Sequence, residues 1–247
     1  MLDNKIAVVT GGNTGIGLAT VACLTADEYQ VVVLGQGEAE SLKPYNAEFI
    51  VCDVSNAAAV EAAFLRISEK HDELHVLVNN AGVLSYGNAV DLSEEEWDKV
   101  MSVNVKGAWL CAKHAIPLMP DGSIVINVAS VQAFVAQPLV AAYATSKSAI
   151  LGLTRSIAID FAPTVRCVAV CPGTVDTPML QGALAQAIDP QAMMDELNAT
   201  HLTGRVGRPE EIGELIVFLA SGKCSFINGQ AIRVDGGLGI NVGGGKN

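Results

Sequence analysis

Seven short apolar runs alternate with helix-like segments along the whole chain, and this alternation strongly constrains the fold. The runs are continuously apolar, which is typical of parallel strands buried on both faces. A regular succession of strands and helices favours right-handed crossovers and a doubly wound α/β sheet. We expect strands over 6–10, 31–34, 48–52, 74–79, 123–128, 166–171 and 231–234. We expect helices over 17–29, 57–70, 94–105 with a broken continuation toward 117, 143–161 and 209–220, and an irregular tail over 236–247.

Composition indicates a single buried domain over residues 1–247. Half of the residues are hydrophobic and only 17% are charged. This is more burial than a monomer needs, so we expect a homo-oligomer. Acidic residues outnumber basic ones 26 to 15, for a net charge of −11. That balance argues against nucleic acid and anionic membranes as partners.

The sequence carries no pattern of secretion, membrane insertion or metal binding. Its first residues run straight into a strand-like segment, and no apolar run approaches the roughly 18 residues that span a bilayer. The six cysteines lack a Cys-x-x-Cys spacing, and Cys167 and Cys171 would lie about 13 Å apart on one strand. The four histidines are scattered. We therefore predict a cytoplasmic protein with reduced thiols and no metal site.

A glycine-rich stretch, TGGNTGIG over 10–17, joins the first expected strand to the first expected helix. Glycines let the backbone approach a pyrophosphate closely, and a helix N-terminus offers free N–H groups and partial positive charge. Its glycines Gly11, Gly15 and Gly17 are spaced more widely than Gly-x-Gly-x-x-Gly. The strand before it and the helix after it nevertheless indicate a dinucleotide site more than a simple tight turn.

Further polar stretches follow other expected strands. The carboxyl ends of parallel strands meet at one edge of a sheet, where ligands bind in such folds. We therefore expect these stretches to gather at one edge: Asp53-Val54, 79–82, Ser130 and 172–177.

Tyr143 and Lys147 are four residues apart in the run YATSK, and Ser130 lies thirteen residues before Tyr143. On a helix this spacing places both side chains on one face. The ammonium is expected to lower the pKa of the phenol, which then serves as a general acid or base for alcohol–carbonyl interconversion. A surface pair on a helix is the alternative for this motif alone. Hydrolysis with Ser130 as the nucleophile is not favoured, because no histidine is evident beside it.

Taken together, these segments resemble the short-chain dehydrogenase/reductase family over essentially the full chain. The matching positions are 10–17, Asp53-Val54, 79–82, Asn104, Ser130, 143–147 and 172–177. The resemblance implies a Rossmann-type, mostly parallel seven-stranded sheet with helices on both faces, a nicotinamide cofactor and a homotetramer.

The resemblance also implies a catalytic set of four residues. Tyr143 would be the general acid or base on the substrate oxygen, and Ser130 would hydrogen-bond the same oxygen. Lys147 would lower the pKa of Tyr143 and bind the nicotinamide ribose. Asn104 would hold a water in a proton relay beyond Lys147.

Cofactor contacts are implied in the same way, with Val175 and Thr177 at the carboxamide and Asp53 and Val54 at the adenine. The residues expected to contact the cofactor are Gly11, Asn13, Gly15, Ile16, Gly17, Gln36, Asp53, Val54, Asn80, Ala81, Gly82, Tyr143, Lys147, Pro172, Gly173, Val175 and Thr177.

NAD is predicted over NADP. An acidic residue at the tip of the second strand would favour NAD and an arginine would favour NADP, but Gly35 and Gln36 are neither. The segment 35–42 carries Glu38 and Glu40 and no basic residue, and Asn13 stands in the glycine turn. A 2′-phosphate would therefore meet repelling charges and no partner.

For the substrate, the sequence around Ser130 and over 166–180 resembles aldose 1-dehydrogenases of the family. Gln132 could then hydrogen-bond a sugar hydroxyl beside Ser130 and Tyr143, with a surface role as an even alternative. The family places its substrate lid over 179–205. We predict oxidation of a sugar or polyol hydroxyl with Tyr143 as general base. The alternatives are a 3-oxoacyl or other carbonyl reductase and, from another class, a non-catalytic dinucleotide-binding protein.

Overall fold

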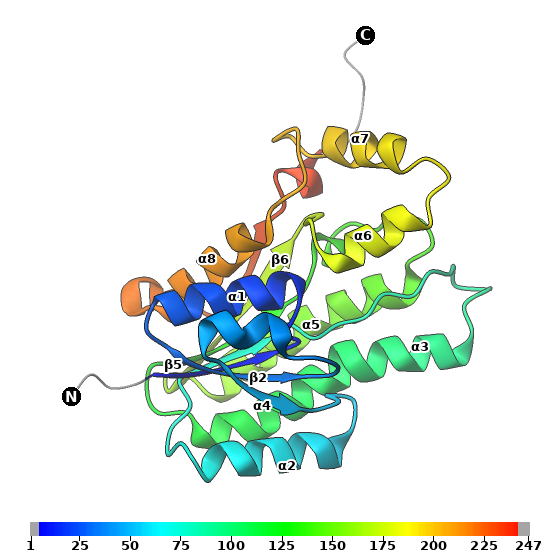
Figure 1. Cartoon of the computed structure of the whole chain (residues 1–247). Coiled ribbons are helices and arrows are strands. Elements are labelled where there is room, and N and C mark those ends of the chain that lie inside the picture. Colours follow the sequence, from blue (N-terminus) through cyan, green and yellow to red (C-terminus); the bar gives the residue numbers. More distant parts are fainter. Residues whose placement is uncertain (1–4, 242–247) are drawn as a thin grey trace.

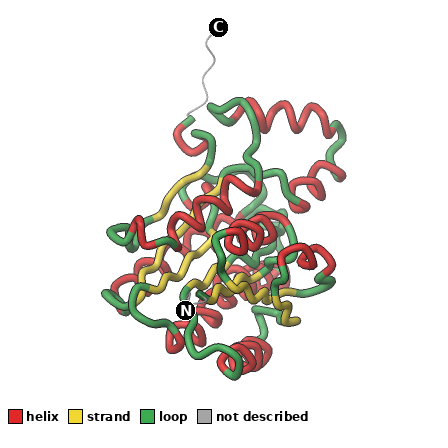
Figure 2. The backbone as a smooth tube through the Cα atoms, turned by 60° about the vertical axis from the view of Figure 1, so that its left-hand side comes forward, coloured by secondary structure: helices red, strands yellow, loops and turns green. Residues whose placement is uncertain are grey.

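Seven parallel strands form one sheet at the centre of the molecule (Figures 1 and 2). The structure is a computed structural model that describes residues 5–241, so residues 242–247 of the expected irregular tail lie outside it. The strands are β1 (Ile6–Thr10), β2 (Gln30–Gly35), β3 (Glu48–Val51), β4 (Val76–Asn79), β5 (Ser123–Val128), β6 (Val165–Pro172) and β7 (Ala231–Val234).

The strand order is β3-β2-β1-β4-β5-β6-β7, so the chain reverses its direction of winding between β3 and β4. Every neighbouring pair is parallel. The predicted doubly wound, Rossmann-type sheet is confirmed. The expectation of a mostly parallel sheet is sharpened, because all seven strands run the same way.

Helices cover both faces of this sheet. Apolar side chains of α1 and α8 pack with one set of strand residues, and those of α2, α4 and α5 pack with the other. Figure 1 shows α1 and α8 on one side of the strands and α2 and α4 on the opposite side. The helices are α1 (Gly15–Ala26), α2 (Ala57–Ser68), α3 (Glu94–Met101), α4 (Ala108–Ala115), α5 (Ala141–Asp160), α6 (Pro178–Ala185), α7 (Pro190–Thr200) and α8 (Pro209–Ala220). In the described residues, none is long and apolar enough to cross a membrane.

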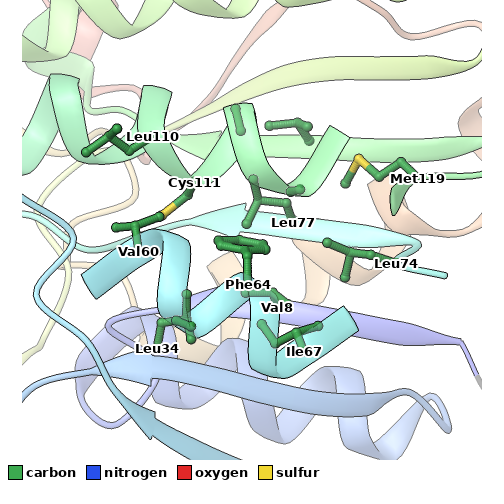
Figure 3. Packing of buried hydrophobic residues seen from close by; sticks show 14 of the residues in the cluster. Val8, Leu34, Val60, Phe64, Ile67, Leu74, Leu77, Leu110, Cys111 and Met119 are labelled. Carbon is green, nitrogen blue, oxygen red and sulfur yellow. The ribbon is translucent and has the colours of Figure 1, made fainter. Parts of the chain in front are cut away.

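The core on the α2 side is made of interlocking aliphatic and aromatic residues. Figure 3 shows Val60, Phe64 and Ile67 of α2 gathered with Leu110 and Cys111 of α4. Each is at most 3% exposed. A buried leucine, isoleucine or phenylalanine side chain contributes about 1.5–3 kcal/mol by leaving water. The packing therefore holds the sheet rigid beneath the edge where the polar stretches gather.

The helix expected over 94–105 with a break toward 117 is three segments. A π-helical turn, η2 (Ser102–Gly107), separates α3 from α4. Single π-helical turns inside helices widen the backbone locally and occur often at functional sites. The remaining short turns are 3₁₀ helices: η1 (Glu40–Tyr45), η3 (Ile116–Leu118), η4 (Val131–Ala133), η5 (Gly222–Cys224) and η6 (Leu238–Ile240).

Candidate active site

A cavity of about 330 Å³ opens at the carboxyl edge of the sheet, where β1, β4, β5 and β6 end. Fourteen of the residues expected at the site line this cavity. They are Gly11, Gly15, Ile16, Asn80, Ala81, Gly82, Ser130, Gln132, Tyr143, Lys147, Pro172, Gly173, Val175 and Thr177. The structure thus brings together stretches that are far apart in the chain.

The glycine turn lies at one end of the cavity and is held by the exit of β4. Thr10 Oγ1 accepts the backbone N–H groups of Asn80 and Ala81 at 3.0 and 2.9 Å. Asn80 Nδ2 donates in return to the carbonyls of Thr10 and Gly11 at 3.0 and 3.1 Å. A Cβ on Gly17 would lie 2.1 Å from the Gly11 carbonyl oxygen, so only glycine fits there.

The start of α1 is available to a ligand. Its N-cap, Thr14, makes no side-chain hydrogen bond to the helix, and the first turn carries no acidic residue. Both Thr14 and the first helical residue, Gly15, line the cavity. Uncapped N–H groups and the positive end of the helix dipole suit the pyrophosphate of a dinucleotide.

Asn13 and Gln36 lie beside the cavity instead of lining it. Asn13 Nδ2 donates to the backbone carbonyls of Gln36 and Glu38 at 2.9 and 3.1 Å. Ser41 Oγ donates to the Asn13 carbonyl at 2.7 Å. Asn13 therefore ties the loop after β2 to the glycine turn, and Gln36 takes part through its backbone.

Asp53 and Val54 also lie outside the cavity lining. Asp53 Oδ1 accepts the N–H and the hydroxyl of Ser55 at 2.9 and 2.7 Å, which turns the chain toward α2. Val54 is buried against the π-helical turn, where a Cβ on Gly107 would meet it at 2.8 Å. Their proposed contacts with the adenine remain a prediction.

Tyr143 and Lys147 lie one turn apart on α5, as predicted, with Ser130 at the exit of β5. Lys147 is 5% exposed, and its Nζ donates to the Val128 carbonyl at 2.8 Å. The same Nζ lies 5.6 Å from the centre of the Tyr143 ring. The phenol, the hydroxyl and the ammonium thus converge on one wall of the cavity.

Burial reverses the expected effect on the phenol. It raises the pKa of Tyr143 above its ordinary value, and the hydrogen bond with the Ser130 side chain offsets this only in part. Burial also lowers the pKa of Lys147 to about 8, against a smaller opposing effect of Cys171. The expectation that the pKa of Tyr143 is lowered was wrong for the protein alone, because a site screened from water disfavours both charged forms.

Asn104 lies behind the cavity, in the π-helical turn. Its Oδ1 accepts the Val83 N–H at 2.8 Å, and its Nδ2 donates to the Val83 carbonyl and to Ser146 Oγ, both at 3.0 Å. A Cβ on Gly82 would lie 3.3 Å from Asn104 Oδ1 and 3.5 Å from Lys147 Nζ. The two polar atoms therefore flank the same small space, which suits the predicted water relay.

The predicted lid, 179–205, contains most of α6 and all of α7, and both helices line the same cavity as Ser130, Tyr143 and Lys147. Met179, Leu180 and Ala183 line the cavity from α6, and Met193 and Leu197 line it from α7. Gln132 and Gln137 also line the cavity, and Gln132 Oε1 accepts the Gln137 N–H at 3.3 Å.

Ser146 and several cavity residues outside the expected stretches were not predicted from the sequence. Ser146 lies inside the YATSK run, and its Oγ donates to the Tyr143 carbonyl at 2.7 Å while it accepts from Asn104. Its place between Tyr143 and Lys147 was the available signal. The lining residues that were not predicted are Thr14, Leu84, Tyr86, Val128, Ala129, Val131, Gln137, Thr174, Pro178 and Leu238.

All six cysteines are free thiols. Within residues 5–241, no group of three or more His, Cys, Asp or Glu side chains is arranged to hold a metal ion.

Comparison with known proteins agrees with this geometry. Residues 11–239 match the family model described as "Enoyl-(Acyl carrier protein) reductase". The chain is 37% identical over 249 residues to 2-(S)-hydroxypropyl-CoM dehydrogenase 3 of Xanthobacter autotrophicus, over 96% of this chain and 97% of that protein. It is similar to the structure of Thermoplasma acidophilum aldohexose dehydrogenase, with a TM-score of 0.94 and 36% identity over 99% and 97% of the two chains. An actinorhodin polyketide ketoreductase solved with NADPH gives a TM-score of 0.90 at 28% identity, over 97% and 98%.

The fold and the site define an oxidoreductase that acts on alcohol or carbonyl groups with a nicotinamide cofactor. The chain belongs to the short-chain dehydrogenase/reductase family.

Proposed function

We propose that the protein oxidises a hydroxyl group of a sugar or polyol with NAD, using Tyr143 as the general base. The observation that carries the proposal is the cavity itself, which joins an uncapped helix start at one end to Ser130, Tyr143 and Lys147 at the other. The likeness to an aldohexose dehydrogenase over nearly the whole chain supports the sugar as substrate.

In this proposal each residue of the catalytic wall, which is formed by Ser130, Tyr143 and Lys147, has one task. A nicotinamide cofactor, when bound, accepts the hydride from the alcohol carbon. Tyr143 Oη takes the hydroxyl proton, and Ser130 Oγ hydrogen-bonds the same oxygen. Lys147 favours the phenolate through its charge, and its pKa of about 8 keeps it largely protonated at pH 7. Asn104, beyond Gly82, would hold the water that passes the proton on.

NAD is proposed over NADP because of the charges at the tip of β2. Asn13 holds the backbone at Gln36 and Glu38, and the next helical turn begins with Glu40. The next lysine along the chain, Lys43, is paired with Glu40 at 2.6 Å. A 2′-phosphate at this loop would be repelled. The measurement is kcat/KM with each cofactor, and a tenfold preference for NADP would contradict the proposal.

Reduction of a more apolar carbonyl compound is the second candidate. The lid side chains Met179, Leu180, Met193 and Leu197 favour it, because they offer few hydrogen bonds to a polyol. A panel of aldoses, polyols, secondary alcohols and ketones, each with NAD(H) and NADP(H) and followed at 340 nm, separates the two. Turnover of an aldose or polyol supports the first candidate, and turnover of apolar ketones alone supports the second.

Tyr143→Phe tests the chemistry independently of the substrate found. We expect turnover to fall by about 10³-fold, since a positioned general acid or base contributes about 10²- to 10⁴-fold. NAD affinity should stay within a few-fold, because the phenyl ring remains. Unchanged turnover would refute the role of Tyr143, and an inactive wild-type protein that binds NAD would favour the non-catalytic alternative.

We also propose that the protein is a cytoplasmic homotetramer, and the exposed face of α3 and α4 supports its association. Trp97 and Trp109 are 38% and 47% exposed there. A groove is lined by Met101, Val105 and Trp109 with the polar residues Asp98, Ser102 and Lys106. Light scattering with size exclusion tests this, and a monomer at micromolar concentration would contradict it.

A further inference from the structure

His201 is a buried polar side chain that the proposed chemistry does not use. It follows α7 directly and is only 3% exposed. Its Nδ1 lies 2.7 Å from the Leu197 carbonyl, and its Nε2 lies 3.2 Å from the Thr174 backbone nitrogen. A carbonyl can only accept and a backbone N–H can only donate. These partners place a donor at Nδ1 and an acceptor at Nε2.

The Thr174 amide belongs to the loop that leaves β6 along the cavity. Other amides of this loop bind backbone carbonyls, since Gly173 N–H donates to Val234 at 3.1 Å and Asp176 N–H donates to Gly207 at 2.9 Å. The Thr174 carbonyl accepts the Gly207 N–H at 2.9 Å. Among these bonds, only that of the Thr174 amide depends on a side chain, and a substitution can therefore remove it.

The His201 imidazole is enclosed by the backbone at Gly173 and Gly236. A Cβ on Gly173 would lie 3.0 Å from His201 Nε2 and 2.9 Å from Asp235 Cα. On the other side, a Cβ on Gly236 would lie 3.3 Å from His201 Cδ2. Gly236 also has a φ of +55°, which side chains rarely adopt. The ring fills the space between these two glycines.

His201 therefore joins two walls of the cavity. Leu197, whose carbonyl accepts from Nδ1, lines the cavity from α7 of the lid. Thr174, Val175 and Thr177 line it from the loop after β6, where the nicotinamide carboxamide is expected. We propose that His201 is a positioning residue, which orients this loop through the Thr174 amide for the nicotinamide end of the cofactor. The inference rests on the proposed use of a nicotinamide cofactor and extends it.

Three substitutions separate the two nitrogens of the ring. His201→Gln keeps an acceptor near the Nε2 position, whereas His201→Asn keeps a polar group only near the Nδ1 position. His201→Leu removes both. Affinities for NAD and for ADP-ribose, which lacks the nicotinamide, are measured by calorimetry, with the melting temperature as a check of folding.

We expect His201→Asn and His201→Leu to bind NAD about 5- to 10-fold more weakly, as the loss of one hydrogen bond to a buried amide implies. ADP-ribose affinity should stay within about twofold, and His201→Gln should retain most of the NAD affinity. If His201→Leu does not fold, the comparison of His201→Gln with His201→Asn still decides the question.

Two results would overturn the inference alone. One is an equal loss for NAD and ADP-ribose, which would make His201 a support of the fold. The other is equal NAD affinity in His201→Gln and His201→Asn, which would show that the acceptor does not matter. A wild-type protein that binds neither ligand would instead overturn the proposed function, and this inference with it.

Discussion

The two ends of the cavity are built in different ways. One end, where we propose that the adenosine binds (the adenosine end), is made of backbone from one short stretch, 10–17, closed by the amide of Asn80. The other, where we propose that the nicotinamide binds (the nicotinamide end), collects side chains from β5, α5, the lid and the loop after β6. The first end depends on the conformation of one turn, and the second depends on distant elements meeting. Substitutions at the first end should therefore lower the affinities for NAD and ADP-ribose equally. Substitutions at the second end should affect the two ligands differently or change how a property depends on pH.

The largest loss of cofactor affinity is expected from Gly17→Ala at the adenosine end. The new Cβ would lie 2.1 Å from the Gly11 carbonyl oxygen and 2.5 Å from Asn80 Nδ2, so the turn must shift. We expect NAD and ADP-ribose affinities to fall together by up to about 100-fold, because overpacking of this kind costs about 1–3 kcal/mol and about 1.4 kcal/mol is tenfold in affinity. Calorimetry with both ligands measures it.

Gly182→Ala in α6 of the lid is the matched control. A Cβ there has no atom within 4 Å, so the change should instead stabilise the helix by about 0.5–1 kcal/mol. NAD affinity near that of the wild type in Gly17→Ala would contradict the description of this turn.

At the catalytic wall, Lys147→Met should change how stability depends on pH. The folded protein loses the Lys147 proton near pH 8, whereas the unfolded chain keeps it to about pH 10.5. The unfolded state thus binds more protons between these values, and stability should rise with pH. The contribution is about 3 kcal/mol over the whole window. Urea unfolding at pH 7, 8.5 and 10 measures the rise, which Lys147→Met should lack.

Making this comparison in a Tyr143→Phe background removes the titration of the neighbouring phenol. If the free energy of unfolding depends on pH equally with and without Lys147, burial does not lower the pKa of this lysine.

A smaller effect is expected from Asn13→Ala, which releases the loop after β2. Two hydrogen bonds, to the carbonyls of Gln36 and Glu38, are lost. We expect about a tenfold loss of affinity, equal for NAD and ADP-ribose, at about 0.5–1.5 kcal/mol for each bond. Ser41→Ala is the control, since it removes only the bond to the Asn13 backbone carbonyl and keeps the Asn13 side chain with its two bonds. A loss confined to NAD would contradict the assignment of Asn13 to the adenosine end.

Much of the secondary structure could be predicted, because buried parallel strands and capped helices have local signatures. The strands over 6–10, 123–128 and 231–234 and the helix over 209–220 have the predicted bounds. The helix predicted from 143 begins at Ala141, so Tyr143 lies in its first turn. The π-helical turn around Asn104 was missed, because it is stabilised by bonds to Val83 and Ser146, which are distant in sequence.

The candidate site could be predicted where its residues follow strands, because parallel strands end at one edge. The sequence predicted less well which hydrogen bonds the individual side chains make. Asp53 binds Ser55 beside it, and Asn13 binds a loop more than twenty residues away. His201 was dismissed as one of four scattered histidines, since nothing near it in sequence points to Thr174.

By itself, the sequence determined the sheet, the glycine turn and which side chains meet at the cavity, because each follows from local pattern and from strand direction. Only the tertiary structure decided how those side chains behave. Burial raises the pKa of Tyr143 and lowers that of Lys147, although the spacing of the pair predicts mutual charge stabilisation. The reason is that desolvation depends on everything packed around a group, and one segment of sequence contains only a small part of those surroundings.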